Sequence, residues 1–405
     1  MNLNILNDDG STNQYIIEKE SLRDEHLKHK VSYISSNSKE QNALNIFKSY
    51  FSDARSILFD ESNKILVEKL KNLNIPEFKS GKIINTIFDN KDFSFVYFTS
   101  GSTGQSTAAL KTKENIESEI RSLSMLLSKY NIQKVVVTVP FIHIYGSLTG
   151  LFYPYFNDID IEFREHFLPN DLLDIIDENT LVVTTPLYIK ALNQISSKKD
   201  LSKSLFLSST APLSIDDVKN FNTKFSCDIV QLFGSTETGG IAYKFNDEVL
   251  WTPLADVVIE TNVNNELKVK SPFVSNELYE KNFTVTNGEI QTFDYIESYQ
   301  DKFKLIGRSS QILKIAGKRY STIQIENILE SQAEIKKALV YVKNDTNSLR
   351  GEVLDITLET TKVFIVKDIK KLLQVKLSNL KFSMDLKCVE KIPISSVGKK
   401  LRIDV

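Results

Sequence analysis

A segment rich in glycine and hydroxyl residues is the first candidate for phosphate chemistry. It follows a short apolar run and precedes a long amphipathic stretch. Backbone N–H groups and hydroxyls in a strand-to-helix turn can donate hydrogen bonds to phosphate oxygens. No Gly-Lys-Ser/Thr follows, so this is not a Walker loop, and a flexible polar turn is the alternative. The residues are Thr99, Ser100, Gly101, Ser102, Thr103 and Gly104.

A second polar segment, residues 231–237, reads Gln-Leu-Phe-Gly-Ser-Thr-Glu and ends an apolar run that begins at Asp228. In an open α/β sheet, ligands bind beyond the carboxyl ends of the strands. Thr236 could therefore hold a phosphate, and Glu237 could hold Mg²⁺, which prefers oxygen ligands. A polar turn that binds nothing is the alternative.

Two basic segments in the C-terminal part could bind anions. Residues 306–319 include Arg308, which could contact a ribose or phosphate oxygen, and they lie where the pattern of the chain changes, as a hinge would. Residues 393–402 place Lys399 after a glycine, where a lysine can reach an anionic substrate as a point charge. Solvated surface turns are the alternative for both segments.

A histidine lies among apolar and aromatic residues in the segment 140–146, which reads Pro-Phe-Ile-His-Ile-Tyr-Gly. This residue, His143, could line a pocket or could be a satisfied core histidine.

The elements that must position these residues alternate between strand and helix. Short apolar runs predict strands, and apolar residues at helical spacing predict helices between them. This alternation predicts an α/β fold with a large doubly wound domain. The predicted strands are 93–98, 134–139, 181–184, 204–208 and 228–233, and the predicted helices are 40–53, 63–73, 114–130, 172–176, 186–195 and 214–221, the last with Ser214 as N-cap.

The pattern changes after residue 248. Short strands separated by polar turns predict a small antiparallel, β-barrel-like subdomain at about 248–300, within a large domain of residues 1–308. Residues 309–405 predict a small C-terminal α+β domain of ordinary size.

The composition excludes several classes of protein. The 405 residues are 41% hydrophobic and 25% charged, as in a globular protein, and the net charge of −2 gives no composition-level case for binding nucleic acid. Two cysteines form neither a disulfide framework nor a CxxC metal pair. We see no signal peptide and no apolar run long enough to span a membrane, so we expect a cytoplasmic protein.

In their order along the chain, these segments resemble the motifs of the adenylate-forming superfamily, which contains acyl- and aryl-CoA synthetases, nonribosomal-peptide adenylation domains and luciferases. The family's phosphate loop, S/T-S-G-S/T-T-G-x-P-K, is matched by residues 99–104, and its YGxTE is matched by 233–237. Further family motifs are GAPL, resembled by Thr210-Ala211-Pro212-Leu213; TGD, by 292–294; GRxDDxIKxxGxR, by 307–319; PxTxxGKxxR, by 393–402; and PxxHxxG of the acyl-CoA ligase branch, by 140–146.

The resemblance implies a two-step reaction. A carboxylate attacks the α-phosphate of ATP to give acyl-AMP and pyrophosphate, and a thiol of CoA or of a carrier-protein phosphopantetheine then takes the acyl group. The resemblance implies that residues 99–104 bind the β- and γ-phosphates, that Thr210, Ala211, Pro212 and Phe233 line the adenine, and that Gly234 belongs to the same ATP/AMP site. It further implies that Thr236 contacts the α-phosphate and that Glu237 binds Mg²⁺. Asp294 and Arg308 would bind the ribose, and Lys399 would bridge the carboxylate and the α-phosphate.

The resemblance also implies an acyl pocket and a rotating C-terminal domain. His143, Gly146 and Leu232 would line the pocket, which favours a fatty or aryl acid. Ser310 stands at the hinge, and the segment from Lys314 to Gly317 would serve the thioester step.

The chain departs from the family pattern at several positions. The loop lysine is absent, although Lys111 is close in sequence; Phe293 replaces the TGD glycine; Ser310 replaces the hinge aspartate; and the region before Thr99 is shorter than usual. Two alternatives therefore stay open: a binding module without full turnover, and an enzyme that delivers acyl-AMP to an amine.

The charge is unevenly divided. Residues 309–405 contain 18 Lys and Arg against 11 Asp and Glu, a net +7, which leaves −9 on residues 1–308. A solvated basic face is one interpretation, and attraction to an anionic acceptor, CoA or an acyl carrier protein, is the other.

Overall fold

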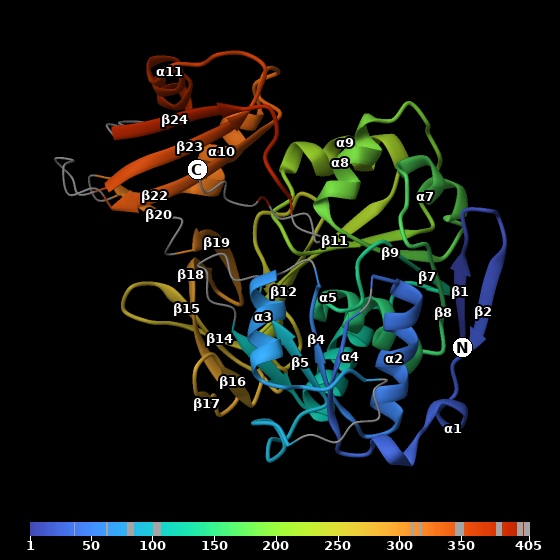
Figure 1. Ribbon diagram of the computed structural model, residues 1–405. Helices are drawn as coiled ribbons and strands as arrows, with labels where there is room; N and C mark the ends of the chain where they lie inside the picture. The colour runs from blue at the N-terminus through green and yellow to red at the C-terminus, as the bar shows by residue number, and fades with distance from the viewer. Residues whose placement is uncertain are drawn as a thin grey trace. The chain divides into compact units, whose positions relative to one another are not determined.

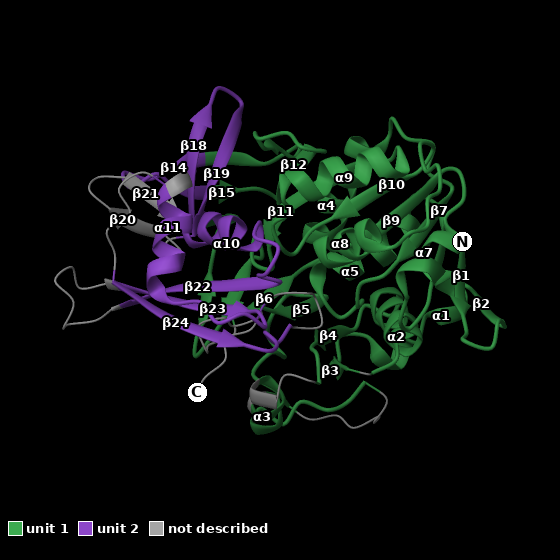
Figure 2. Cartoon of the chain, turned by 90° about the horizontal axis from the view of Figure 1, so that it is seen from above, with its two compact units in different colours: residues 1–259, 269–290 green, residues 260–268, 291–405 purple. Residues whose placement is uncertain are grey.

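The structure of the protein, a computed structural model, describes most of the chain (Figure 1). The described residues are 1–35, 37–61, 64–78, 85–99, 107–308, 312–315, 318–344, 352–377, 383–394 and 400. The chain divides into two units (Figure 2): unit 1 comprises residues 1–259 and 269–290, and unit 2 comprises residues 260–268 and 291–405.

Unit 1 contains a nine-stranded sheet with a parallel centre. Strands β11, β10, β9, β7, β8 and β1 pair in parallel, whereas β2, β12 and β13 extend the edges in antiparallel pairing. In spatial order the strands are β13 (Thr252–Pro253), β12 (Gly239–Phe245), β11 (Asp228–Ser235), β10 (Leu205–Ser208), β9 (Thr180–Thr184), β7 (Lys134–Val137), β8 (Asp160–Phe163), β1 (Asn2–Leu6) and β2 (Thr12–Ile16).

Side chains of the central strands alternate between two apolar cores, as the pleat of a strand requires. Val182 of β9 packs in a core with helices α7, α8 and α9, whereas Leu181 and Val183 pack in the core on the opposite face. Because both faces are buried, these strands are continuous apolar runs in the sequence. The helices are α7 (Pro169–Ile175), α8 (Pro186–Gln194) and α9 (Ile215–Phe225).

A second sheet shares one of these cores. Phe95 and Tyr97 of β5 pack in the same core as Val135 of β7, together with helices α2 and α4, so these two helices lie between the sheets. Helix α3 packs in a separate core with the other face of β5. The sheet has the order β17 (Phe283–Val285), β16 (Glu277–Tyr279), β6 (Ala108–Lys111), β5 (Phe95–Phe98), β4 (Arg55–Leu58) and β3 (Val31–Ile34); the helices are α2 (Lys39–Phe51), α3 (Lys64–Asn72) and α4 (Lys113–Leu127).

Shorter helical segments complete unit 1. They are α1 (Lys19–Leu22), a 3₁₀ turn (Glu25–Leu27), α5 (Ile144–Ser147), a π-helical turn (Leu148–Phe152) and α6 (Tyr153–Phe156). No helix in the described ranges is long and apolar enough to cross a membrane.

Unit 2 combines two helices with two small sheets and with most of a third, four-stranded sheet, of which residues 258–259, 269–270 and 289–290 fall in unit 1. Helices α10 (Thr322–Glu330) and α11 (Val366–Lys376) share an apolar core with the three-stranded sheet. The sheets are β14 (Val258–Thr261), β15 (Glu266–Lys270), β18 (Glu289–Tyr299) and β19 (Lys302–Arg308); β20 (Ile312–Ile315) and β21 (Lys318–Ser321); and β22 (Lys337–Asn344), β23 (Glu352–Glu359) and β24 (Ser383–Val389).

The predicted α/β fold class is confirmed, and the long helices begin and end near their predicted residues. The Ser214 Oγ accepts a hydrogen bond of 3.1 Å from the backbone N–H of Asp217, so the predicted N-cap is confirmed. The region 248–300 differs in detail, because β16 joins the six-stranded sheet through β6, opposite residues 108–110. Such distant pairing leaves no local signal in the sequence. The domain boundary at residue 308 stays a prediction.

Thr210, which stands where the family motif has glycine, adopts a φ of +81°. A residue that carries a Cβ rarely adopts a positive φ, and β-branched residues adopt it least readily. Strain of this kind costs about 1–3 kcal/mol. The positive φ at this position therefore explains why the family motif has glycine there.

We expect Thr210→Gly to raise the free energy of unfolding by about 1 kcal/mol, because relief of strain exceeds the entropy that glycine gains in the unfolded chain. Urea unfolding followed by circular dichroism would measure the change. Thr185→Gly is the matched control: Thr185 has a φ of −123°, so glycine there should destabilise. Equal destabilisation by both substitutions would contradict the assignment of strain to Thr210.

Candidate active site

The glycine- and hydroxyl-rich segment connects two antiparallel strands, not a strand and a helix as its position in the sequence suggested. Phe98 of β5 pairs with Ala108 of β6. Thr99 donates a backbone hydrogen bond of 2.9 Å to Thr107 O, and the Thr107 N–H donates to the Thr99 Oγ1 at 3.0 Å. The ends of the connection are thus fixed. Ser100, Gly101, Ser102, Thr103 and Gly104 lie outside the described residues.

Strand β11 ends in a tight turn that presents Thr236 and Glu237. The backbone N–H groups of Ser235 and Thr238 donate to each other's hydroxyl oxygens at 3.1 and 3.2 Å. A Cβ on Gly234 would lie 2.3 Å from the Gly239 carbonyl oxygen, so only glycine fits the close approach of the two strands here. This turn lies at the carboxyl end of a parallel strand, as predicted.

The Glu237 carboxylate accepts no hydrogen bond and forms no salt bridge with any residue that the structure describes, although its backbone carbonyl is bonded twice. That carbonyl accepts hydrogen bonds from Ser275 N at 2.9 Å and from the Lys111 ammonium at 3.2 Å. The backbone is therefore held, and the carboxylate oxygens have the chemistry that Mg²⁺ prefers. The Glu237 carboxylate is therefore suited to bind Mg²⁺.

Aromatic residues pack beside this turn. The rings of Phe233 and Trp251 have centroids 5.6 Å apart, tilted by 53°. The sequence reasoning did not single out Trp251, although it is the one tryptophan of the chain. The predicted Thr210, Ala211 and Pro212 follow β10, which pairs in parallel with β11, and the Ser209 hydroxyl donates to Leu232 O at 3.0 Å. The structure thus places the start of the segment that follows β10 beside the carboxyl-terminal half of β11.

The segment around His143 is fixed to the same edge of the sheet. The Tyr145 hydroxyl lies 2.6 Å from Leu207 O and 3.1 Å from Thr184 O, at the ends of β10 and β9. His143 Nε2 lies 3.9 Å from Asp60 Oδ2, and no sequence motif points to this neighbour. Gly146 is buried in α5. His143 is therefore held near charge and is not a purely apolar core residue.

Asp294 and Arg308 lie opposite each other on strands β18 and β19 of unit 2. Arg308 Nε donates to Asp294 Oδ1 at 3.1 Å, and Asp294 is only 5% exposed. The two predicted ribose ligands thus form an ion pair. Phe293, which precedes Asp294 in β18, is 67% exposed, because alternate residues of the strand face opposite sides. The Phe293 side chain, which replaces the glycine of the motif, therefore points to the side of β18 opposite to Asp294.

Three predicted residues of unit 2 cannot be placed. Ser310, Gly317 and Lys399 lie outside the described residues, and of Lys314 only the backbone, in β20, is described.

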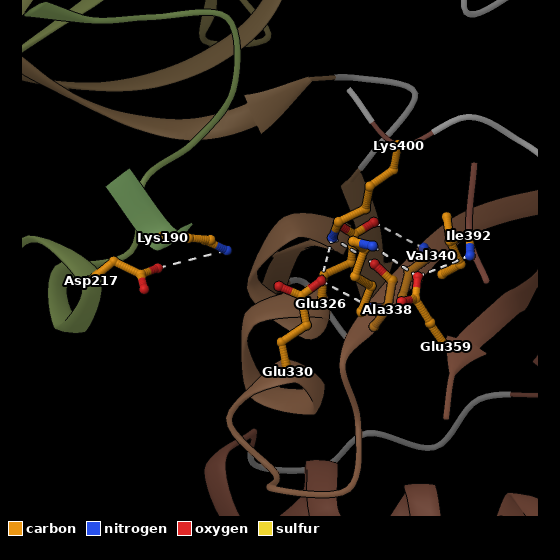
Figure 3. A network of polar contacts seen from close by, with 10 residues as sticks. Lys190, Asp217, Glu326, Glu330, Ala338, Val340, Glu359, Ile392 and Lys400 are labelled. Carbon is orange, nitrogen blue, oxygen red and sulfur yellow. Dashed lines mark hydrogen bonds and ion pairs between the residues drawn. The ribbon is translucent and has the colours of Figure 1, made fainter. Parts of the chain in front are cut away.

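Lys400, which follows the predicted catalytic lysine in sequence, lies in a polar network that the sequence reasoning missed (Figure 3). Its ammonium donates to Glu326 Oε2 at 2.8 Å, to Glu330 Oε1 and to the Ala338 carbonyl at 2.6 Å. Burial alone would lower the pKa of Lys400, but the two carboxylates raise it above its ordinary value. Ile394 and Lys400 also form an antiparallel bridge. Lys400 is therefore fixed to helix α10.

Lys111 does not replace the missing loop lysine. Its side chain is 1% exposed, and its ammonium donates to the carbonyls of Glu237 and Phe273 at 3.2 and 2.5 Å. A lysine bonded in this way inside the protein has no donor directed to solvent. The phosphate loop thus lacks a lysine from this strand.

Comparisons with known proteins agree with this architecture. The family model described as AMP-binding enzyme matches residues 13–277. The chain is 24% identical over 362 residues to the peroxisomal OPC-8:0-CoA ligase 1 of Arabidopsis thaliana, which covers 80% of this chain and 66% of the relative. It is 23% identical over 326 residues to a putative long chain fatty acid-CoA ligase, VraA, of Staphylococcus haemolyticus, covering 77% and 69%. The chain thus spans about two thirds of the length of these relatives.

Solved structures show the same fold. The O-succinylbenzoate coenzyme A synthetase MenE from Bacillus subtilis, in complex with ATP and magnesium, has a TM-score of 0.79 at 15% identity, over 98% of this chain and 95% of that chain. ATP-bound MatB from Rhodopseudomonas palustris has a TM-score of 0.77 at 14% identity, over 98% and 93%. The match of the family model, which includes both the phosphate-loop segment and the β11 turn, shows that the chain belongs to the family of AMP-binding enzymes.

Proposed function

We propose that the protein activates a carboxylic acid with ATP and transfers the acyl group to a thiol. The observation that carries the proposal is the β11 turn, which presents Thr236 and the Glu237 carboxylate at the carboxyl edge of a parallel sheet in an AMP-binding enzyme. The names of the relatives, which are CoA ligases, support CoA as the acceptor. A carrier-protein phosphopantetheine is the second candidate acceptor.

In the first step, a carboxylate oxygen of the acid forms a bond to the α-phosphorus of ATP, and pyrophosphate leaves with the electron pair of the broken P–O bond. Thr236 donates a hydrogen bond to the α-phosphate, and Glu237 holds Mg²⁺, which neutralises phosphate charge when bound. Lys399 adds positive charge between the carboxylate and the α-phosphate. Reactions of this kind gain mostly from positioning and electrostatic stabilisation.

In the second step, the thiolate sulfur forms a bond to the acyl carbon, and AMP leaves with the electron pair of the C–O bond. We propose that the small C-terminal domain, residues 309–405, rotates between the steps about Ser310 and then presents the segment from Lys314 to Gly317 to the thiol. We also propose that His143, Gly146 and Leu232 line the acyl pocket. A pocket lined largely by apolar residues favours a fatty or aryl acid.

We expect Mg²⁺-dependent ATP–pyrophosphate exchange with one acid from a panel of fatty and aryl acids. Lys399→Ala should lower the exchange rate by about 10²–10³-fold, since it removes one charge-stabilising group. Exchange that survives unchanged in this variant would contradict the role of Lys399. Binding of ATP without exchange for any acid would favour a binding module instead.

Asp294→Asn tests the ribose contact. We expect the KM for ATP to rise about tenfold, because a neutral amide binds ribose hydroxyls more weakly than a carboxylate does, by about 1.4 kcal/mol. The KM for the acid should stay unchanged. Asp301→Asn is the control, because Asp301 is an exposed residue in the turn between β18 and β19. An unchanged KM for ATP in Asp294→Asn would remove the residue from the nucleotide site.

The basic residues of helix α11 allow a test of the acceptor. Lys367 and Lys371 are exposed and Lys370 is half-buried on this helix. If they attract an anionic acceptor, raising the salt from about 50 to about 500 mM should raise the acceptor's KM several-fold through screening. Assays with CoA and with a holo carrier protein would measure this effect separately. If the KM of neither acceptor depends on salt, the basic residues of α11 form a solvated surface that does not attract the acceptor.

A further inference from the structure

Two buried, ionisable side chains contact the β11 turn and interact with each other electrostatically. Lys111, the last residue of β6, is 1% exposed, and Glu119 of helix α4 is 6% exposed. Neither residue belongs to a motif of the proposed reaction. Charged side chains are seldom buried unless specific partners hold them, so the partners indicate what the pair does.

The Lys111 ammonium joins two backbone segments. It donates to the carbonyl of Glu237 in the turn and to the carbonyl of Phe273 in the segment that follows β15. The same segment supplies the Ser275 N–H that also donates to the Glu237 carbonyl. The Glu237 peptide is therefore held from two directions.

Glu119 holds the other side of the turn. Its Oε1 accepts a hydrogen bond of 2.7 Å from the backbone N–H of Gly240. A Cβ on Gly239 would lie 2.4 Å from Glu119 Oε2, and Gly239 has a φ of +73°, so the turn is closed tightly over this carboxylate. Together, Lys111 and Glu119 fix the turn at both Glu237 and Gly240.

We propose that Lys111 and Glu119 are positioning residues that hold the Glu237 carboxylate in the geometry needed to bind the metal–nucleotide complex. This inference rests on the proposed function only in the role that it gives to Glu237. Neither residue contacts the reacting atoms.

The electrostatics of the pair agree with a positioning role. Burial lowers the pKa of Lys111 to about 8, against the opposing effect of Glu119 and Glu237. Burial raises the pKa of Glu119, and Lys111 opposes that shift. Replacing buried ionic pairs with apolar or neutral groups often leaves stability unchanged or raises it. Stability alone therefore gives no reason for a charged pair at this place.

A comparison of single and double variants separates positioning from stability. Lys111→Met leaves Glu119 buried without its counter-charge, so it should lower the melting temperature and also weaken binding of the metal–nucleotide complex. Lys111→Met/Glu119→Gln removes both charges and keeps an oxygen acceptor for Gly240. We expect the double variant to regain most of the lost melting temperature, but not to regain the binding.

The probe is Mn²⁺ with a non-hydrolysable ATP analogue, and bound Mn²⁺ is measured by electron paramagnetic resonance. We expect the Kd for Mn²⁺ to rise about tenfold in both variants. Lys39→Met is the matched control, because Lys39 is also a buried lysine that donates to two backbone carbonyls, Thr138 O at 3.1 Å and Arg164 O at 3.0 Å. It should lose melting temperature without a change in the Kd for Mn²⁺.

A double variant that binds Mn²⁺ as tightly as the wild type would overturn the inference and leave the pair a purely structural feature. An equal rise in the Kd for Mn²⁺ in the control variant Lys39→Met would also overturn the inference. Weakened binding in a protein that shows no exchange with any acid would support the inference while contradicting the proposed function. A wild-type protein that binds no Mn²⁺–nucleotide complex would overturn both.

Discussion

The packing of helix α4 between two sheets is the constraint on which the candidate site of unit 1 depends. Its apolar side, which includes Ile116, Ile120 and Leu123, lies in the core that both sheets share. Several of its polar residues are also buried, and one of them, Asn115, donates through Nδ2 to Pro272 O at 2.8 Å and to Val274 O at 3.1 Å. Helix α4 thus packs against both sheets and also holds the segment 272–274, and protein interiors transmit small displacements instead of absorbing them.

The edge of the nine-stranded sheet is held by side chains from several elements. Tyr145 connects the segment that follows β7 to the ends of β9 and β10, and burial raises the pKa of its hydroxyl, which stays protonated and can donate to a carbonyl. Glu119 and Lys111 hold the turn after β11. In unit 2, Asp294 and Arg308 are fixed on adjacent strands by their ion pair. Glu237 in unit 1 and the Asp294–Arg308 pair in unit 2 are therefore positioned by contacts within their own units before any ligand binds.

The sequence predicted the features that depend on local periodicity and missed those that depend on distant contacts. The strands and helices of unit 1 follow from apolar spacing, and the Ser214 cap follows from residue type. The phosphate-loop segment was placed wrongly before a helix, because β6 has only four residues, Ala108–Lys111, and pairs with β16, far away in the chain. Lys111 and Lys400 were missed as anchors, since a lysine in a sequence is normally read as solvated. The partners of Lys111 lie 126 and 162 positions away, a separation that no local pattern reveals.

The departures from the family pattern differ in their physical consequences. Phe293 is exposed on β18 and has an ordinary backbone conformation, whereas Thr210 adopts a strained, positive φ where the motif has glycine. The missing loop lysine has the largest consequence, because Lys111, which follows the loop in β6, has its ammonium committed to two backbone carbonyls. Under the proposed reaction, positive charge for the phosphates must then come from the metal at Glu237 and from the basic C-terminal part of the chain, which carries Lys399 and a net charge of +7. Under the proposed reaction, the basic C-terminal part of the chain compensates for the lysine that the phosphate loop lacks.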